Sequence, residues 1–210
     1  SDLGKWKPEN YGKKFYGPTT LRKGIEYSRN LMTVRIAKIL GLNKILELSK
    51  KLNIYDEIPE LLSVSLGAAE TTLLNLTAAY APFVNGGKKI DPSLITRIQD
   101  RRGKTIFKVK NRECFGCDKF INQSSTLPKI QNTNDQVLSE ETAYQMTAIL
   151  SGAVERGTAK KLRSLKVPLA GKTGTTNDNY DAWFIGFTSN LVIGVYIGFD
   201  NPKTLGKFET

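Results

Sequence analysis

The sequence predicts an α+β fold in which a helical lobe packs against an antiparallel sheet. Apolar residues recur at helical spacing over much of the first 90 residues and again after Ser139. Three β-rich segments follow closely on one another near the C-terminal end, which is typical of an antiparallel meander. The helices and the meander therefore predict two packed layers.

The first 90 residues are predicted to form the helical lobe. Residues 1–30 are rich in Gly, Pro, Tyr and Lys and predict irregular structure. The stretch "LMTVRIAKIL" then predicts a helix that ends at Gly41, and a second helix follows over residues 43–53. A long buried helix is expected from about Thr71 to the glycine pair Gly86-Gly87.

Residues 91–137 are predicted to leave the core as a hairpin and a polar loop. β-branched residues alternate around Arg102-Gly103 and predict the hairpin, whereas residues 111–137 predict a loop. Residues 138–166 are expected to be helical, with Ser139 as an N-cap and Gly157 as the stop. Residues 167–200 predict three antiparallel strands, at Pro168–Thr176, Ala182–Thr188 and Leu191–Phe199.

The composition excludes several classes of function. The chain has no histidine, which rules out Ser-His-Asp and Cys-His mechanisms and the usual histidine-bearing metal sites. A hydroxyl nucleophile would need lysine or a carboxylate as its base. The net charge of +11 is scattered along the chain without a nucleic-acid-binding motif. We therefore expect no metal, no cofactor and no nucleic-acid partner.

The two cysteines lie close together in the polar loop, at Cys114 and Cys117. Their surroundings lack the strand and helix that flank a thioredoxin-like pair, which favours a small structural disulfide. Such a disulfide suits an oxidising compartment. Two free thiols in a reducing compartment remain the alternative.

Two short motifs carry candidate functional residues. Lys172-Thr173-Gly174-Thr175 lies on the first predicted strand, where a cation, hydroxyl groups and an open strand edge would bind a carboxylate and a developing oxyanion. Ser28-Arg29-Asn30 precedes the first clear helix. Helix capping by Ser28 or Asn30 is the alternative explanation for that motif.

Ser-x-Asn on a helical lobe and Lys-Thr-Gly on a sheet edge are two of the three signatures of the penicillin-recognising serine enzymes. Longer stretches match as well: "WKPENYGKKFYGPTTLRKGIEYSRN", "SLGAAETTLLNLTAAYAPFVNGG", "AYQMTAILSGAVERGTA", "AGKTGTTNDNYDAWFIGF" and "YIGFD". The chain resembles the transpeptidase domain of a class A, bifunctional penicillin-binding protein. That resemblance implies a penicillin-binding-protein/serine β-lactamase-like fold.

The resemblance also implies a mechanism and the role of each matching residue. Lys172 would attract the carboxylate of a stem peptide or a β-lactam, with Thr173, Gly174 and Thr175 lining the strand edge and the Thr175 N–H forming half of an oxyanion hole. Ser28 would relay protons between a catalytic lysine and Lys172, and Asn30 would bind the peptide amide.

The implied reaction is D,D-transpeptidation, and the implied setting is the bacterial cell wall. A serine would be acylated by D-Ala-D-Ala, and a neighbouring stem peptide on a glycan strand made from lipid-linked precursor would then be cross-linked. The resemblance places the domain outside the cytoplasmic membrane, in the periplasm, held by an anchor beyond this chain.

The third signature, Ser-x-x-Lys, is absent from the sequence. Its nearest forms, Thr20-Leu-Arg-Lys23 and Thr204-Leu-Gly-Lys207, carry threonine in an unrelated context. Truncation is the simplest explanation, so we expect the 210 residues alone to be inactive, with an incomplete sheet and self-association. A β-lactamase, a β-lactam sensor and a non-catalytic scaffold module remain alternatives.

Overall fold

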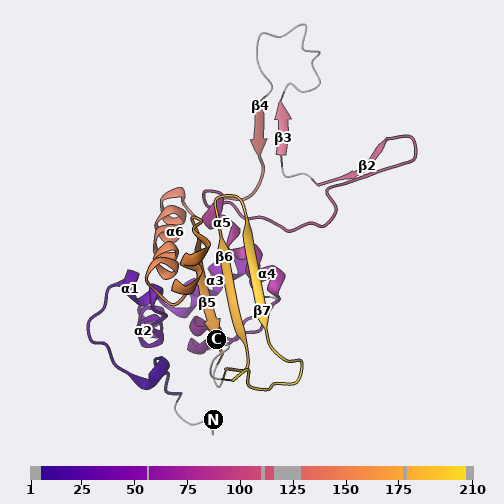
Figure 1. The fold of residues 1–210 in the computed structure, drawn as a ribbon. Coiled ribbons are helices and arrows are strands. Elements are labelled where there is room, and N and C mark those ends of the chain that lie inside the picture. The colour runs from indigo at the N-terminus through magenta and orange to yellow at the C-terminus, as the bar shows by residue number, and fades with distance from the viewer. Residues whose placement is uncertain (1–5, 56, 110–111, 116–128, 177–178, 207–210) are drawn as a thin grey trace.

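The computed structural model describes residues 6–55, 57–109, 112–115, 129–176 and 179–206. Figure 1 shows a lobe of helices against an antiparallel sheet, with two hairpins extending from this body. This arrangement confirms the predicted α+β class. No helix in the described ranges is long and apolar enough to cross a membrane.

The elements fall into a helical first half, a hairpin region and a final sheet. The helical elements are η1 (Tyr11–Lys13), α1 (Leu21–Glu26), α2 (Asn30–Leu40), α3 (Leu42–Lys51), η2 (Leu62–Leu66), α4 (Leu73–Ala79), α5 (Ala81–Val84), α6 (Glu140–Glu155) and η4 (Lys160–Leu165). The strands are β1 (Arg97–Gln99), β2 (Thr105–Lys108), β3 (Arg112–Phe115), β4 (Lys129–Asn132), β5 (Ala170–Thr175), β6 (Ala182–Phe187) and β7 (Val192–Ile197).

The prediction of irregular structure over residues 1–30 is wrong at η1 and α1. Helix α1 begins at a conventional N-cap, because the Thr20 hydroxyl oxygen accepts a hydrogen bond from the Lys23 N–H at 3.3 Å. Gly24 obscures this short helix by its low helix propensity. A Cβ atom there would lie 1.7 Å from the Met32 Cε atom, so the Met32 side chain of α2 fills the space beside Gly24.

The expected long helix from Thr71 is also wrong, because the structure has two shorter helices there. Helix α4 starts at the N-cap Thr72, whose hydroxyl oxygen accepts a hydrogen bond from the Asn75 N–H, and it ends at Ala79. Pro82 lies in the first turn of α5. Proline lacks the N–H that a continuous helix would direct at the carbonyl four residues earlier, so the helix is interrupted before it.

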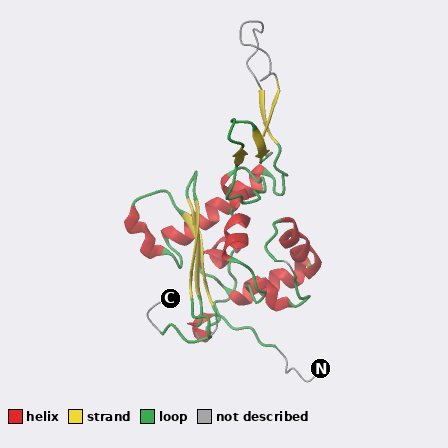
Figure 2. Ribbon diagram, turned by 90° about the vertical axis from the view of Figure 1, so that its right-hand side faces the viewer, coloured by secondary structure: helices red, strands yellow, loops and turns green. Residues whose placement is uncertain are grey.

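Lys172 lies on the helix-covered face of the sheet β5-β6-β7. It pairs with Ile185 of β6, which pairs with Gly194 of β7, and directly paired residues project from the same face. A Cβ atom on Gly194 would lie 2.0 Å from the Thr77 hydroxyl oxygen, so α4 covers this face. Figure 2 shows the same sheet almost edge-on beside the helices.

The core joins the same face of the sheet to α6. Leu150 of α6, Ala170 of β5 and Phe187 of β6 are buried together. Residues from α1, from α5 and the position before it, and from β7 pack around this cluster: Ile25, Tyr80, Phe83, Val84 and Val192. The core therefore holds α1, α6 and β5 in fixed relation, and these elements carry or flank both candidate motifs.

The hairpin region leaves the body between α5 and α6. Strands β1 and β2 form the predicted hairpin, but residues 112–115 and 129–132 pair as a second hairpin where a loop was expected. Both of its strands are largely polar, so no alternating pattern revealed them. Cys114 pairs in register with Ile130, whereas Cys117, and with it the predicted disulfide, lies outside the described residues.

Backbone hydrogen bonds close the base of this hairpin region. The Gly87 carbonyl oxygen accepts from the N–H groups of Val137 and Leu138 at 2.9 and 3.0 Å, and the Lys89 N–H donates to the Asp135 carbonyl at 2.8 Å. The two ends of the hairpin region therefore lie side by side.

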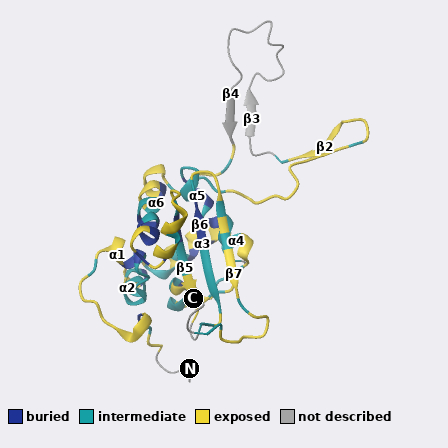
Figure 3. Cartoon of the chain, viewed as in Figure 1, coloured by how far each residue is buried: buried dark blue, intermediate teal, exposed yellow. Residues whose placement is uncertain are grey.

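Strand β7 is exposed along much of its length, whereas its neighbour β6 is half-buried or buried (Figure 3). Ile193, Val195 and Ile197 are 49, 43 and 53% exposed, and no described strand pairs with the outer edge of β7. An exposed apolar strand edge promotes pairing between chains. We therefore predict that the isolated 210-residue chain self-associates in light scattering and that Val195→Lys shifts it toward monomer. A monodisperse wild-type monomer would contradict this prediction.

Candidate active site

The two predicted motifs meet at a contact between Ser28 and Lys172. The Lys172 Nζ atom donates hydrogen bonds to the Ser28 Oγ atom and, at 2.7 Å, to the Thr173 carbonyl oxygen. Ser28 lies in the turn between α1 and α2 with a left-handed backbone, at φ 51°. The fold thus brings together two residues that are 144 positions apart in the sequence.

Burial changes the proton affinity of Lys172. It lowers the pKa of the ammonium group from 10.5 to about 8, because desolvation penalises the charged form. The amine is mostly protonated at neutral pH, yet it releases its proton more readily than a surface lysine. A group with such a pKa can attract an anion and can also take part in proton exchange.

Among the described strands none pairs with the outer edge of β5, so backbone polar groups of this strand face outward there. The Thr176 N–H points toward β6, where it donates to the Asp181 carbonyl oxygen at 3.1 Å. Successive residues of a strand alternate the side to which their N–H and C=O groups point. The N–H groups of Thr175 and Thr173 therefore face the open edge, on the side where Lys172 contacts the Thr173 carbonyl.

Asn30 is the first residue of α2 and lies two positions after Ser28. Its side-chain Nδ2 atom donates to the Glu9 carbonyl oxygen at 2.9 Å. The Leu31 N–H at the start of α2 donates instead to the Asn10 Oδ1 atom, at 3.1 Å. Neither Ser28 nor Asn30 caps the helix, because the N-cap position is Arg29 and it has no side-chain cap.

The family model described as the penicillin binding protein transpeptidase domain matches residues 1–209. The chain belongs to this family.

The motifs predicted a similarity to the class A penicillin-binding proteins. Sequence matches to proteins named penicillin-binding protein 1A confirm it. The protein from Rickettsia typhi is 46% identical over 209 residues, covering 98% of this chain and 26% of the relative. The protein from Pseudomonas aeruginosa is 33% identical, covering 97% of this chain and 29% of the relative. The chain therefore spans about a quarter of the length of these curated relatives.

Solved penicillin-binding proteins share the fold. The crystal structure of penicillin-binding protein 1A from Haemophilus influenzae covers 100% of this chain with 34% of its own, at a TM-score of 0.81 and 32% identity. The imipenem acyl-enzyme of penicillin-binding protein A from M. tuberculosis aligns with 98% of this chain and 48% of its own, at a TM-score of 0.70 and 20% identity. The predicted penicillin-binding-protein/serine β-lactamase-like fold is confirmed.

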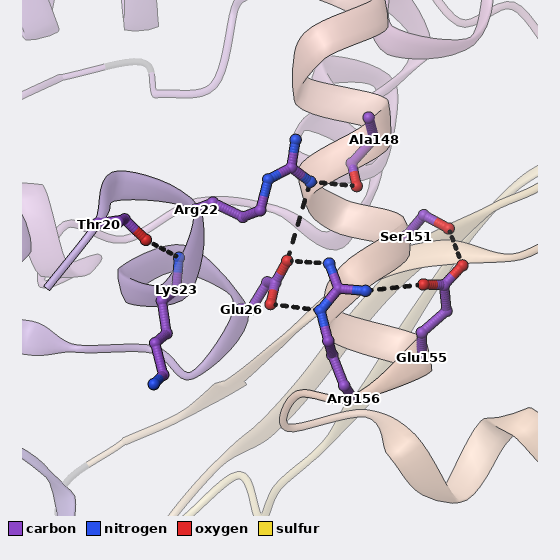
Figure 4. Close-up of polar contacts among 8 residues, drawn as sticks. All are labelled: Thr20, Arg22, Lys23, Glu26, Ala148, Ser151, Glu155 and Arg156. Carbon is purple, nitrogen blue, oxygen red and sulfur yellow. Dashed lines mark hydrogen bonds and ion pairs between the residues drawn. The ribbon is translucent and has the colours of Figure 1, made fainter.

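In this penicillin-binding-protein domain, a buried carboxylate and a half-exposed arginine form an ion pair that the sequence motifs did not indicate. The carboxylate of Glu26 is 3% exposed and accepts two hydrogen bonds from Arg156, at 3.0 Å from Nε and 2.6 Å from Nη2 (Figure 4). Arg22 lies 3.9 Å away and also donates to the Ala148 carbonyl oxygen. These contacts join α1 to α6 only two residues before Ser28.

A second omission is the pair of hydroxyl groups at Thr158 and Thr173, whose Oγ1 atoms lie 2.8 Å apart. Arg156 and Thr158 both flank Gly157, the predicted helix stop. Their position directly after a helix was the only feature of the sequence that pointed to these two residues. A charged residue inside a short helix, such as Glu26, gave no indication of its partner.

Trp183 and Asp181 contribute to the packing and the hydrogen bonds of the sheet. The Trp183 ring packs on Tyr196 with centroids 4.7 Å apart. The Tyr196 hydroxyl donates to the Asp181 Oδ1 atom at 2.9 Å, and this hydrogen bond raises the pKa of Tyr196. Both interactions join β7 to β6 or to the turn before it.

Proposed function

We propose that the complete protein is a penicillin-sensitive D,D-transpeptidase that cross-links peptidoglycan stem peptides through a serine acyl-enzyme. The nucleophile would lie outside these 210 residues. Two facts support that location: the sequence contains no Ser-x-x-Lys, and the chain spans about a quarter of its curated relatives. The 210-residue chain alone would then be inactive.

The observation that carries this proposal is the position of the Lys172 ammonium group. It contacts the Ser28 hydroxyl, and its strand has an edge with outward-facing N–H groups beside it. A protonated amine at that place can bind the terminal carboxylate of a stem peptide. The neighbouring N–H of Thr175 can donate to an oxygen that becomes negative during acyl transfer.

In the acylation step, the serine oxygen attacks the carbonyl carbon of the penultimate D-Ala. A serine ester bond forms, the peptide bond to the last D-Ala breaks, and a proton passes to the departing amine. In the second step, an amine of a neighbouring stem peptide attacks the ester and the serine recovers its proton. A β-lactam ring would open in the same first step.

The proposed roles follow from the contacts of each residue. Ser28, hydrogen-bonded to Lys172, would relay protons between a catalytic lysine and Lys172. Asn30 would bind the amide of the peptide, and this role requires its Nδ2 group to exchange the Glu9 carbonyl for the ligand. Thr173, Gly174 and Thr175 would line the bound strand of substrate.

The proposed partners are stem peptides on glycan strands assembled from lipid-linked precursors, and β-lactams as inhibitors. Nucleic acid, metals and cofactors have no part in this mechanism. The proposed location is extracytoplasmic, with the anchor in a segment of the protein other than this one.

Intact-mass measurement after exposure to penicillin tests the proposal. We expect a penicillin adduct on a version extended by about 60 residues upstream and none on the 210-residue chain. An adduct on one of the serines of the 210-residue chain would contradict its predicted inactivity. No adduct on either version would favour a non-catalytic scaffold.

A second measurement separates the transpeptidase from the β-lactamase alternative. The half-life of the acylated extended protein should be long for a penicillin-binding protein or a sensor and short for a lactamase. Cross-linked product from a stem-peptide substrate would then distinguish the transpeptidase from a β-lactam sensor.

A further inference from the structure

Backbone and side-chain contacts connect the turn after α6 with both motifs of the candidate site. The Thr158 N–H donates to the Glu26 carbonyl oxygen at 3.1 Å, and its hydroxyl lies 2.8 Å from the Thr173 hydroxyl. Thr173 precedes Gly174 on β5, and Glu26 precedes the turn with Ser28 by one residue. Thr158 is therefore bonded to both sides of the Ser28–Lys172 contact.

The close approach of this turn to Glu26 depends on a glycine. A Cβ atom on Gly157 would lie 2.2 Å from the Glu26 carbonyl oxygen and 2.8 Å from the Ala153 Cα atom. Both of these atoms belong to the backbone, so they cannot move aside as a flexible side chain would. The absence of a side chain at Gly157 allows the Thr158 N–H to reach the Glu26 carbonyl.

A carboxylate ligand would give the hydrogen bond between the two hydroxyl groups a fixed direction. An ionised carboxylate can only accept, so the Thr173 hydroxyl must donate its single proton to it. The Thr173 oxygen would then accept the proton of Thr158. Such a chain of hydrogen bonds strengthens each member by polarisation, and it holds Thr173 in one rotamer.

We propose that Thr158 is a positioning residue for recognition of the ligand carboxylate, acting through the Thr173 hydroxyl. This inference rests on the proposed function. It extends the carboxylate site beyond Lys172, Thr173 and Thr175 to a residue outside both motifs. Thr158 itself does not touch the ligand.

The test compares Thr158→Val with Thr158→Ser in the acylatable full-length protein. Valine keeps the shape and the backbone N–H but removes the hydroxyl, whereas serine retains it. We expect Thr158→Val to slow acylation by benzylpenicillin by up to about tenfold, the upper size of a lost hydrogen bond between neutral groups. Thr158→Ser should restore the rate to within about twofold of wild type, and Thr105→Val in the β1–β2 hairpin is the matched control.

Acylation by the methyl ester of benzylpenicillin shows whether Thr158→Val affects recognition of the carboxylate alone or disrupts the whole site. The ester lacks the ionised carboxylate, so Thr158→Val should change its acylation rate by less than about twofold. An equal loss with the acid and the ester, or no loss with either, would overturn the inference. The double variant Thr158→Val/Thr173→Val should be no slower than Thr173→Val, and additive losses would also count against it.

The ¹³C shift of the Thr173 methyl group gives a readout that needs no acylation. It follows the χ1 rotamer, and we expect one rotamer in wild type and Thr158→Ser but averaging in Thr158→Val. An unchanged shift in Thr158→Val overturns the positioning role even when acylation proceeds. Failure of the wild-type protein to react with penicillin instead overturns the proposed function, while the methyl shift still decides whether Thr158 positions Thr173.

Discussion

Replacing Lys172 with methionine is expected to slow acylation of the full-length protein by penicillin by about 100- to 1,000-fold. Methionine keeps most of the length of the side chain but removes the cation that contacts Ser28. The measurement is the second-order rate constant with a labelled penicillin. Lys161→Met, at an exposed lysine of η4, is the matched control, and its rate should stay within about twofold of wild type.

The low pKa of Lys172 also predicts the pH dependence of acylation. The cation is lost as the pH rises through about 8, so the rate with a carboxylate-bearing ligand should fall about tenfold per pH unit above it. In Lys172→Arg the guanidinium stays protonated, and this decline should move to higher pH in any variant that retains activity. A wild-type profile without a break between pH 7 and 9 would contradict the assigned role.

The same pKa has the opposite consequence for stability. Below pH 8 the amine is charged in both the folded and the unfolded state, and the folded state bears the full cost of burying the charge. Between pH 8 and 10.5 the folded state loses the proton while the unfolded state keeps it, so the free energy of unfolding rises with pH. Lys172→Met should remove this rise, which amounts to about 3 kcal/mol at most.

Replacing Arg156 with methionine is expected to lower the free energy of unfolding, because it leaves the buried Glu26 carboxylate without its main partner. The Glu26 carboxylate is 3% exposed and would lose both hydrogen bonds that Arg156 donates, leaving a buried charge with Arg22 at 3.9 Å. The melting temperature should fall accordingly. Thermal unfolding followed by circular dichroism measures the change.

Two further variants distinguish the effect of leaving the Glu26 carboxylate unpaired from other effects of removing Arg156. Glu155→Gln breaks only the exposed pair of Arg156 with Glu155, at 2.9 Å, and should cost less than about 0.5 kcal/mol. Adding Glu26→Gln to Arg156→Met removes the unpaired charge and should recover part of the loss. If Arg156→Met and Glu155→Gln lowered the free energy of unfolding equally, the ion pair of Arg156 with Glu26 would contribute no more to stability than the exposed pair with Glu155.

Local signals were sufficient to predict most of the fold. Ser139 caps α6 by accepting from the Thr142 N–H at 3.2 Å, and the three strands of the sheet lie inside their predicted ranges. Helix α1 and the break between α4 and α5 were missed because Gly24 and Pro82 have roles set by packing and by backbone chemistry. The sequences of β3 and β4 mix polar and apolar residues without the alternation that would indicate a strand.

Only those residues of the candidate site that belong to the two sequence motifs could be predicted. Ser28 and Lys172 come from two recognisable tripeptides, and the structure brings these residues into contact. The partnership of Glu26 with Arg156 and of Thr158 with Thr173 depends on how α1, α6 and β5 pack together. No sequence spacing encodes a contact between residues 130 positions apart, so these interactions required the three-dimensional arrangement.

The paired base of the hairpin region has a consequence for how the chain tolerates insertions. Its ends meet through the hydrogen bonds of Gly87 and Lys89 with residues 135–138, so the length of the segment between need not change the position of α5 relative to α6. Lengthening that segment adds only loop-closure entropy, roughly 0.6 kcal/mol for each doubling of its length. Insertions into this appendage are therefore expected to leave the contact between Ser28 and Lys172 in place.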